Sequence, residues 1–389
     1  MAVEPLETSE IKSVQALKTH LRHAAQLEMS TIPMYLYAAY SIQTQGDSQW
    51  VPGMSAFRAI RSVVIEEMLH LCLVRNLMVA IGGGDQLTFY DKAFVPTYPS
   101  PMLHRTPELP LKLAPLSVQL MQDTFLPLEL PESTDAPPQP DRYHTLGQFY
   151  AAIKEGFERL DCPELWAQNQ PDLQYQGAYW NEDGGGQPLV VYDLPSALAA
   201  ICIIVEQGEG CAAGDDKVPM RPDLPVAGED ELSHYAKFRG IADNLDRLEK
   251  LNIWPVPTNP TLAEYAGSRA EALAELFNAA FCYVLAMIDA LYTSSRATVQ
   301  PGQTSARYGL ERTFIAAMGG LLFPIAALLV TIELPSGQRA APTFEFFEFA
   351  KTSSKRDQLA AMCDKLIGHF PSLGGDNGVR RLIKLMPSV

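Results

Sequence analysis

The sequence predicts a mainly α-helical protein whose core is a four-helix bundle. Apolar residues recur at i, i+3 and i+4 through four segments, about 11–43, 54–81, 195–208 and 229–251, which is the spacing of amphipathic helices. A proline-rich stretch of roughly 85–193 separates the first two segments from the last two. Such a stretch suits the long crossover that joins two helix pairs in some bundles.

The two N-terminal helices have clear boundaries. The first is expected from about Ile11 to Gln43, with Pro33 bending it locally. The stretch "GDSQWVPG" predicts a turn after it. The second helix is expected from about Met54 to Ile81, where three glycines that begin at Gly82 supply a C-cap.

The crossover contains one predicted helix, from Thr145 to Leu160. Two short alternating stretches, "DLQYQGAYW" and "QPLVVYDL", flank "NEDGGG" and predict a small hairpin. After the fourth bundle helix, further helices are expected at 262–295, 308–332 and near 355–369. We therefore divide the chain into a metal-binding bundle, residues 1–260 with the crossover at about 85–193, and accessory helices packed on it, residues 261–389.

Residues 314–332 form an uncharged run of nineteen residues, which is long enough to cross a membrane. Gly319, Gly320 and Pro324 within it suit close packing or a kink, so we expect a core helix. The N-terminus lacks a basic region followed by an apolar one, and a cytoplasmic location is expected.

The composition is that of a globular protein, with 47% hydrophobic and 19% charged residues. A net charge of -15 and the lack of a basic run argue against nucleic acid or an anionic membrane as partner. The six cysteines, at 72, 162, 202, 211, 282 and 363, show no regular spacing, which indicates core packing in a reducing compartment and no disulfide framework.

Acidic residues and a histidine occupy the apolar faces of the first two helices. Glu28 lies on the apolar stripe of the first helix, and Glu67 and His70 lie one turn apart on the stripe of the second. Glu66 lies about 100° off that stripe and is expected beside the ligands or on the surface. At 1.5 Å per residue, Glu28 and Glu67 reach levels that differ by only ~3 Å, so they can meet.

The third and fourth helices repeat this pattern. Glu206 and Glu209 continue the apolar line of the third helix, and the sequence leaves open which of them points inward, with Glu206 favoured. Glu231 and His234 stand three residues apart at the start of the fourth helix. The third helix ends just after Glu206 and Glu209, and the fourth begins just before Glu231. In an antiparallel pair of helices, these glutamates and His234 are therefore expected at the same level.

In chain order the sequence thus presents Glu, Glu-x-x-His, Glu and Glu-x-x-His. This is the ligand set of the ferritin-like carboxylate bundles that hold two iron or two manganese ions. Carboxylates neutralise and bridge two hard divalent ions, while one imidazole each leaves sites for dioxygen or substrate. We expect two metal ions, iron first and manganese as the alternative, bound by residues that also carry the catalysis: Glu28, Glu67, His70, Glu206, Glu231 and His234, with Glu209 as alternative or additional ligand.

Seven stretches, in order between about 27 and 240, resemble the signature blocks of the VioB-like ferritin-like family, the iminophenyl-pyruvate dimer synthase domain. They are "LEMSTIPMYLYAAYSI", "IEEMLHLCLVRNLMVAIGG", "FVPTYPSPM", "FLPLELPE", "TLGQFYAAI", "IIVEQGEG" and "ELSHYAKF". The resemblance implies a ferritin-like bundle, a dinuclear metal centre and an oxidative step in natural-product biosynthesis. The best-known reaction of that family couples two imines derived from aromatic amino acids.

The sequence therefore favours a non-haem di-iron oxidase or oxygenase that acts on a small aromatic or apolar metabolite with dioxygen. Two alternatives stay open: a metal-dependent lyase, cyclase or dehydratase on the same scaffold, and an iron-storage protein. Storage fits less well, because the crossover and three extra helices do not suit a compact shell subunit. The oligomeric state stays open, a homo-oligomer included.

Overall fold

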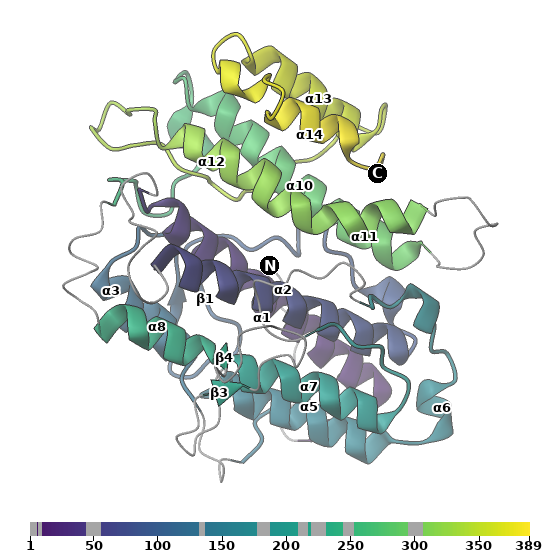
Figure 1. The fold of residues 1–389 in the computed structure, drawn as a ribbon. Helices are drawn as coiled ribbons and strands as arrows, with labels where there is room; N and C mark the ends of the chain where they lie inside the picture. Colours follow the sequence, from purple (N-terminus) through teal and green to yellow (C-terminus); the bar gives the residue numbers. More distant parts are fainter. Residues whose placement is uncertain are drawn as a thin grey trace.

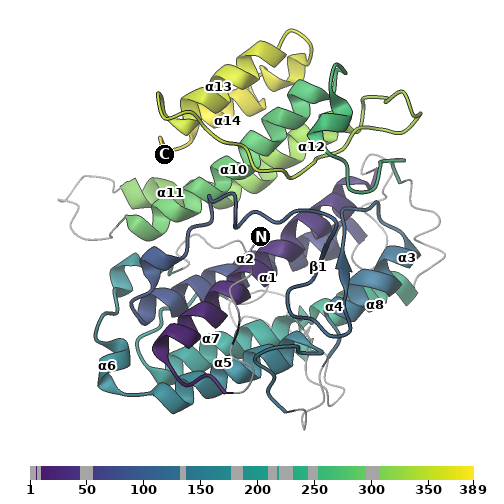
Figure 2. The same ribbon diagram turned by 180° about the vertical axis from the view of Figure 1, so that it is seen from behind.

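The computed structural model describes residue 6 and residues 10–43, 56–131, 137–176, 187–208, 217–218, 231–243, 253–294 and 306–389. Described residues are mainly helical and form the predicted helical bundle (Figure 1). A second layer of helices, which follows residue 261, lies along one side of the bundle (Figures 1 and 2). The division into residues 1–260 and 261–389 stays a prediction.

Two continuous helices form the centre of the bundle. Helix α1 spans Val14–Tyr40, and Ser13 caps it by accepting a hydrogen bond from the backbone N–H of Ala16. Helix α2 spans Ala56–Ala80, packs along α1, and is buried over nearly all its length because both of its sides are covered. It ends at Gly82, whose φ of +68° is the left-handed conformation of a helix C-cap. Both predicted helices and the glycine cap are confirmed; the turn "GDSQWVPG" lies outside the described residues.

The other two bundle helices are each split into two pieces. One side consists of α7 (Leu194–Gly208) and α8 (His234–Asp243). The other consists of α5 (Leu146–Leu160) and of one uninterrupted helical run made of α3 (Val118–Leu120), η2 (Met121–Phe125) and α4 (Leu126–Leu128). Helices α7 and α8 both pack on α2, one after the other (Figure 1). Helix α5 pairs with α7, and the α3–α4 run pairs with α8.

This arrangement corrects the predicted one. The third and fourth predicted helices were expected to be antiparallel neighbours, but α7 and α8 follow one another along α2. The crossover was expected only to connect the helix pairs, but its segments 118–128 and 146–160 supply the fourth side of the bundle. The fourth predicted helix was also expected from about 229, whereas α8 begins at His234, after a two-residue strand β4 (Glu231–Leu232) that pairs with β3 (Lys217–Val218).

The rest of the crossover is irregular. It holds the short elements η1 (Gly84–Gln86), β1 (Ser100–Pro101), β2 (Pro110–Leu111), α6 (Pro163–Trp166) and η3 (Pro171–Leu173). The predicted hairpin is wrong in its described parts, because 171–176 and 187–193 contain no strand. Side-chain amides join them instead: Gln174 bonds the backbone of Val191, and Asn76 bonds the carbonyls of Tyr175 and Leu189.

The C-terminal layer contains η4 (Leu262–Tyr265), α10 (Glu271–Thr293), α11 (Ala306–Ala317), η5 (Met318–Leu322), α12 (Phe323–Leu329), α13 (Lys355–Leu366), η6 (Pro371–Leu373) and α14 (Val379–Leu385). Within the described residues, α10 alone is long and apolar enough to cross a membrane, but 83% of its most apolar window is buried, as in a core helix. The uncharged run 314–332 contains the π-helical turn η5, which joins α11 directly to α12. Five cysteines are described, and all are free thiols.

Candidate metal centre

Three carboxylates and two imidazoles meet in the middle of the bundle. Glu28 comes from α1, Glu67 and His70 from α2, Glu129 from the residue that ends α4, and His234 from the first residue of α8. All five are at most 4% exposed. They form two groups, Glu28–Glu67–His70 and Glu67–Glu129–His234, and in each the candidate ligand atoms lie within 4.8 Å of one another. Glu67 belongs to both groups.

Each imidazole turns one nitrogen toward the carboxylates. His70 Nδ1 lies 3.4 Å from Glu28 Oε2, and His70 Nε2 lies 3.1 Å from Gln207 Oε1. Because an amide oxygen only accepts, His70 donates from Nε2, which leaves Nδ1 as an acceptor. His234 Nδ1 lies 3.1 Å from Glu67 Oε1 and 3.6 Å from Glu129 Oε2. The two rings stack with their centroids 5.3 Å apart.

Four further side chains hold these groups from outside. The hydroxyl of Tyr35 donates a hydrogen bond to Glu129 Oε1 over 2.5 Å. The hydroxyl of Tyr150 donates a hydrogen bond to Glu28 Oε1. Burial first, and then the neighbouring carboxylates, raise the pKa of both phenols well above the ordinary value, so they stay protonated donors. Glu66 Oε2 lies 2.9 Å from His234 Nε2, and Lys237 Nζ contacts both oxygens of Glu66 at 2.7 Å.

The electrostatics of the cluster are dominated by burial and by the closeness of like charges. Burial, followed by the charges of Glu28 and Glu129, raises the pKa of Glu67 well above its ordinary value. Burial by itself would raise the pKa of Glu28, but the neighbouring imidazole of His70 outweighs it, and that pKa is lowered. Burial lowers the pKa of His234, and the charge of Glu129 outweighs it, so the net pKa is raised. Glu67 is therefore a carboxylate whose negative charge is opposed by its surroundings.

The donor set fits two divalent cations. Carboxylate oxygens and imidazole nitrogens are the ligands that iron and manganese take in such bundles. His234 Nδ1 is buried and makes no hydrogen bond, although two carboxylates lie close to it. His234 Nδ1 and the carboxylates of Glu67 and Glu129 thus face one another without a hydrogen bond, which is the arrangement expected of ligands that share one ion. Since Glu67 belongs to both groups, it is placed to bridge a pair.

The structure brings together four of the predicted site residues, Glu28, Glu67, His70 and His234. Glu206 is not among them: its Oε1 lies 3.0 Å from Cys202 Sγ on the same helix, away from both groups. Glu209 lies outside the described residues. Glu231 lies in β4 and not in the helix of His234, and its side chain is not described.

Two residues of the site were not predicted. Glu129 follows a helical run within the proline-rich crossover, where no apolar stripe points to it. The resemblance supplied the only signal, because the block "FLPLELPE" contains this residue. Gln207 is buried and reaches His70 from the end of α7, from the position next to Glu206. Its place on α7 differs by 100° from that of Glu206, which explains why only one of the two faces the cluster.

Comparisons with known proteins agree with this fold. A family model described as Ferritin-like matches residues 21–243. A dichlorochromopyrrolate synthase from Lentzea aerocolonigenes is 28% identical over 90% of this chain and 38% of its own length. A 2-imino-3-(indol-3-yl)propanoate dimerase from Chromobacterium violaceum is 28% identical over 86% of this chain and 34% of its own length. The chain thus spans little more than a third of the length of these curated relatives.

A solved structure of a ferritin-like protein from Caulobacter vibrioides superposes with a TM-score of 0.56 and 23% identity. The superposition covers 86% of this chain and 99% of that protein. This likeness supports the fold alone. The family model and the two relatives confirm the resemblance to the VioB-like ferritin-like group.

Proposed function

The chain belongs to the Ferritin-like family, and from that membership and its buried cluster we propose that it is an enzyme with a dinuclear metal centre. We propose two iron ions, with manganese as the alternative that fits the same ligands. The proposed reaction is an oxidative step on a small metabolite derived from an aromatic amino acid, in natural-product biosynthesis and in the cytoplasm. The observation that carries the proposal is the pair of Glu–Glu–His groups that share Glu67.

Glu28 and His70 would hold one ion, Glu129 and His234 the other, and Glu67 would contact both. A bound pair of iron ions supplies electrons to dioxygen and positive charge toward an anionic or imino substrate. Three carboxylates offer three negative charges against four positive ones. Glu209 or Glu231 stays a predicted source of the fourth carboxylate, since the side chain of Glu206 lies away from both groups.

The surrounding side chains fix the orientation of the ligands. Gln207 accepts from His70 Nε2, so the lone pair of Nδ1 faces the carboxylates. Tyr150 and Tyr35 each donate to one carboxylate oxygen, which leaves the other oxygen for a cation. Both phenols would act as hydrogen-bond donors to these carboxylates, because their raised pKa keeps them protonated. Glu66, whose charge is balanced by Lys237, lies 2.9 Å from Nε2 of His234 and so faces the other nitrogen of that ring.

The substrate class is proposed from the relatives and from the walls of the site. One relative is named for dimerising an indole-bearing imino acid and the other for making a dichlorochromopyrrolate. Beside the ligands, Leu146 of α5 and Ile204 and Val205 of α7 form an apolar wall around a cavity of about 10 Å³. This cavity has room for about one water. An aromatic metabolite would therefore approach along the apolar side chains of α5 and α7.

Metal analysis of the purified protein tests the centre. We expect close to two metal ions per chain in the wild type and loss of both in Glu67→Ala, because that carboxylate belongs to both groups. Glu206→Ala is the matched control, since this side chain lies away from both groups, and it should keep the metal. A folded wild type that binds no iron or manganese would overturn the proposal.

Oxygen uptake tests the reaction class. The imines of phenylpyruvate and indole-3-pyruvate can be generated in place by an amino acid oxidase with catalase. We expect additional oxygen uptake and a dimeric product by mass spectrometry with the wild type, and neither with Glu67→Ala. A product formed without oxygen uptake would identify a lyase, cyclase or dehydratase. A large, iron-filled particle in light scattering would identify a storage protein.

A further inference from the structure

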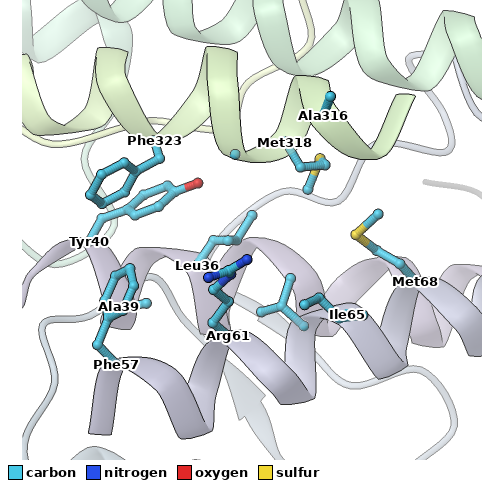
Figure 3. Close-up of a pocket in the computed structure, with 12 residues that line it drawn as sticks. Leu36, Ala39, Tyr40, Phe57, Arg61, Ile65, Met68, Ala316, Met318 and Phe323 are labelled. Carbon is cyan, nitrogen blue, oxygen red and sulfur yellow. The ribbon is translucent and has the colours of Figure 1, made fainter. Parts of the chain in front are cut away.

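A cavity of about 430 Å³ lies between the bundle and the C-terminal layer (Figure 3). Helices α1 and α2 form its floor, and α11, η5 and α12 form its roof. Its volume lies within the range of about 300–1,000 Å³ that small-molecule sites occupy. Most of its twelve lining residues are apolar, and Tyr40, Phe57 and Phe323 form an aromatic wall at one end. The rings of Tyr40 and Phe57 lie 6.0 and 5.8 Å from that of Phe323.

Two polar groups point into this cavity. Tyr40 is 7% exposed, and its hydroxyl is directed into the cavity (Figure 3). None of the described residues forms a hydrogen bond with that hydroxyl. The guanidinium of Arg61 enters from α2, and it is the one charged side chain among the lining residues (Figure 3). A phenol donor and a guanidinium that line one apolar cavity suit an anionic group on an apolar body.

The roof of the cavity has an unusual backbone. Residues Met318–Leu322 form a π-helical turn, and such turns occur frequently at functional sites. Gly319 lies in this turn and lines the cavity, and a Cβ added there would meet no atom within 4 Å. Among the described residues, no side chain fills the space that a Cβ on Gly319 would enter.

The cavity is separate from the metal centre. Its α2 lining includes Val64, Ile65 and Met68, while Glu67 and His70 face the other side of the helix. At 100° per residue, the cavity face and the ligand face of α2 lie roughly 140° apart. A molecule in this cavity would therefore not touch the metals.

We propose that this cavity is a second binding site, for a small aromatic carboxylate. The carboxylate would bind Arg61 and the hydroxyl of Tyr40, and the ring would lie against Phe57 and Phe323. The site holds a ligand of the same chemical class as an aromatic amino-acid derivative, but on the opposite face of α2 from the proposed chemistry. The proposal goes beyond the proposed function and does not depend on it, because none of its residues belongs to the metal centre.

Isothermal titration calorimetry with indole-3-acetate as probe tests this site. We expect one equivalent to bind the wild type, and indole, which has the ring but no charge, to bind at least about tenfold more weakly. Arg61→Gln should weaken binding of indole-3-acetate by about tenfold or more, because a charge-assisted hydrogen bond is lost. Gly319→Leu should abolish binding by filling the cavity.

Gly309→Leu is the matched control. Gly309 also lies in a helix of the C-terminal layer with no atom within 4 Å of an added Cβ, but it does not line the cavity. This variant should bind the probe within twofold of the wild type. The proposal is overturned if the wild type shows no binding at millimolar probe, or if Arg61→Gln and Gly319→Leu bind as tightly as the wild type.

Discussion

The buried ion pair behind His234 allows a quantitative test of how the site is held. Lys237 Nζ lies 2.7 Å from both oxygens of Glu66, and Glu66 Oε2 lies 2.9 Å from His234 Nε2. All three side chains are at most 5% exposed. Replacing Lys237 by methionine keeps most of the side-chain volume and removes only the charge. We expect this change to destabilise the metal-free protein strongly.

The magnitude follows from the geometry. With an effective dielectric constant of about 20, two unit charges 2.7 Å apart attract by roughly 6 kcal/mol, and desolvation offsets much of this. Lys237→Met leaves the carboxylate of Glu66 buried without its cation, which costs about 3–5 kcal/mol. The double variant with Glu66→Gln removes both charges and keeps an acceptor for His234. We expect it to lose only about 1–2 kcal/mol.

Urea unfolding of the two variants, followed by circular dichroism, measures these differences. Arg239→Met is the control on the same helix, because the pair of Arg239 with Asp243 is exposed and its loss should cost about 0.5 kcal/mol or less. Lys237→Met should also weaken metal binding by about 10–100-fold, because the group that orients His234 is disturbed. If the double variant is as unstable as Lys237→Met, the two charges are not coupled and the reasoning is wrong.

Three further predictions concern other parts of the molecule. Gln207→Leu removes the acceptor of His70 Nε2 and should weaken metal binding by about 10–100-fold in a chelator competition assay, whereas Glu206→Gln should not. Arg307→Met removes a buried guanidinium that bonds five backbone carbonyls, and should cost about 3–5 kcal/mol in urea unfolding without loss of metal. Burial raises the pKa of Asp289, so its contribution to stability should fall as pH rises above the ordinary value of 3.8; Asp289→Asn should flatten this slope in unfolding measured against pH.

The continuous helices were predictable because their sequence carries a clear period. Apolar residues through α1 and α2 recur every three or four positions, so the stripe identifies the buried face and places Glu28, Glu67 and His70 on it. Burial of a carboxylate requires a partner, and that requirement alone pointed to a cluster. The structure brings these three residues together.

Two residues of the site, Glu129 and Gln207, were not predicted. Glu129 was missed because a helical period says nothing about what lies beyond a helix end. Glu129 is the residue at which α4 stops, and His234 is the residue at which α8 starts. A stripe argument assumes a helix on both sides of the residue, so it extended the fourth helix back to Glu231 and overlooked the crossover. The sequence argument weighed only the carboxylates Glu206 and Glu209 at the end of the third helix, whereas the side chain that reaches His70 is the amide of Gln207.

The split helices explain why this cluster can form. A continuous helix offers one inward side chain about every turn, so α1 and α2 supply only Glu28, Glu67 and His70 at the level of the site. The other two sides of the bundle are interrupted at this same level: α4 and α7 end there, and α5 and α8 begin there. Each interruption brings one negative and one positive helix end to the site, so the helix dipoles largely cancel. The side chains therefore set the charge of the centre, and the net excess of carboxylates selects for cations.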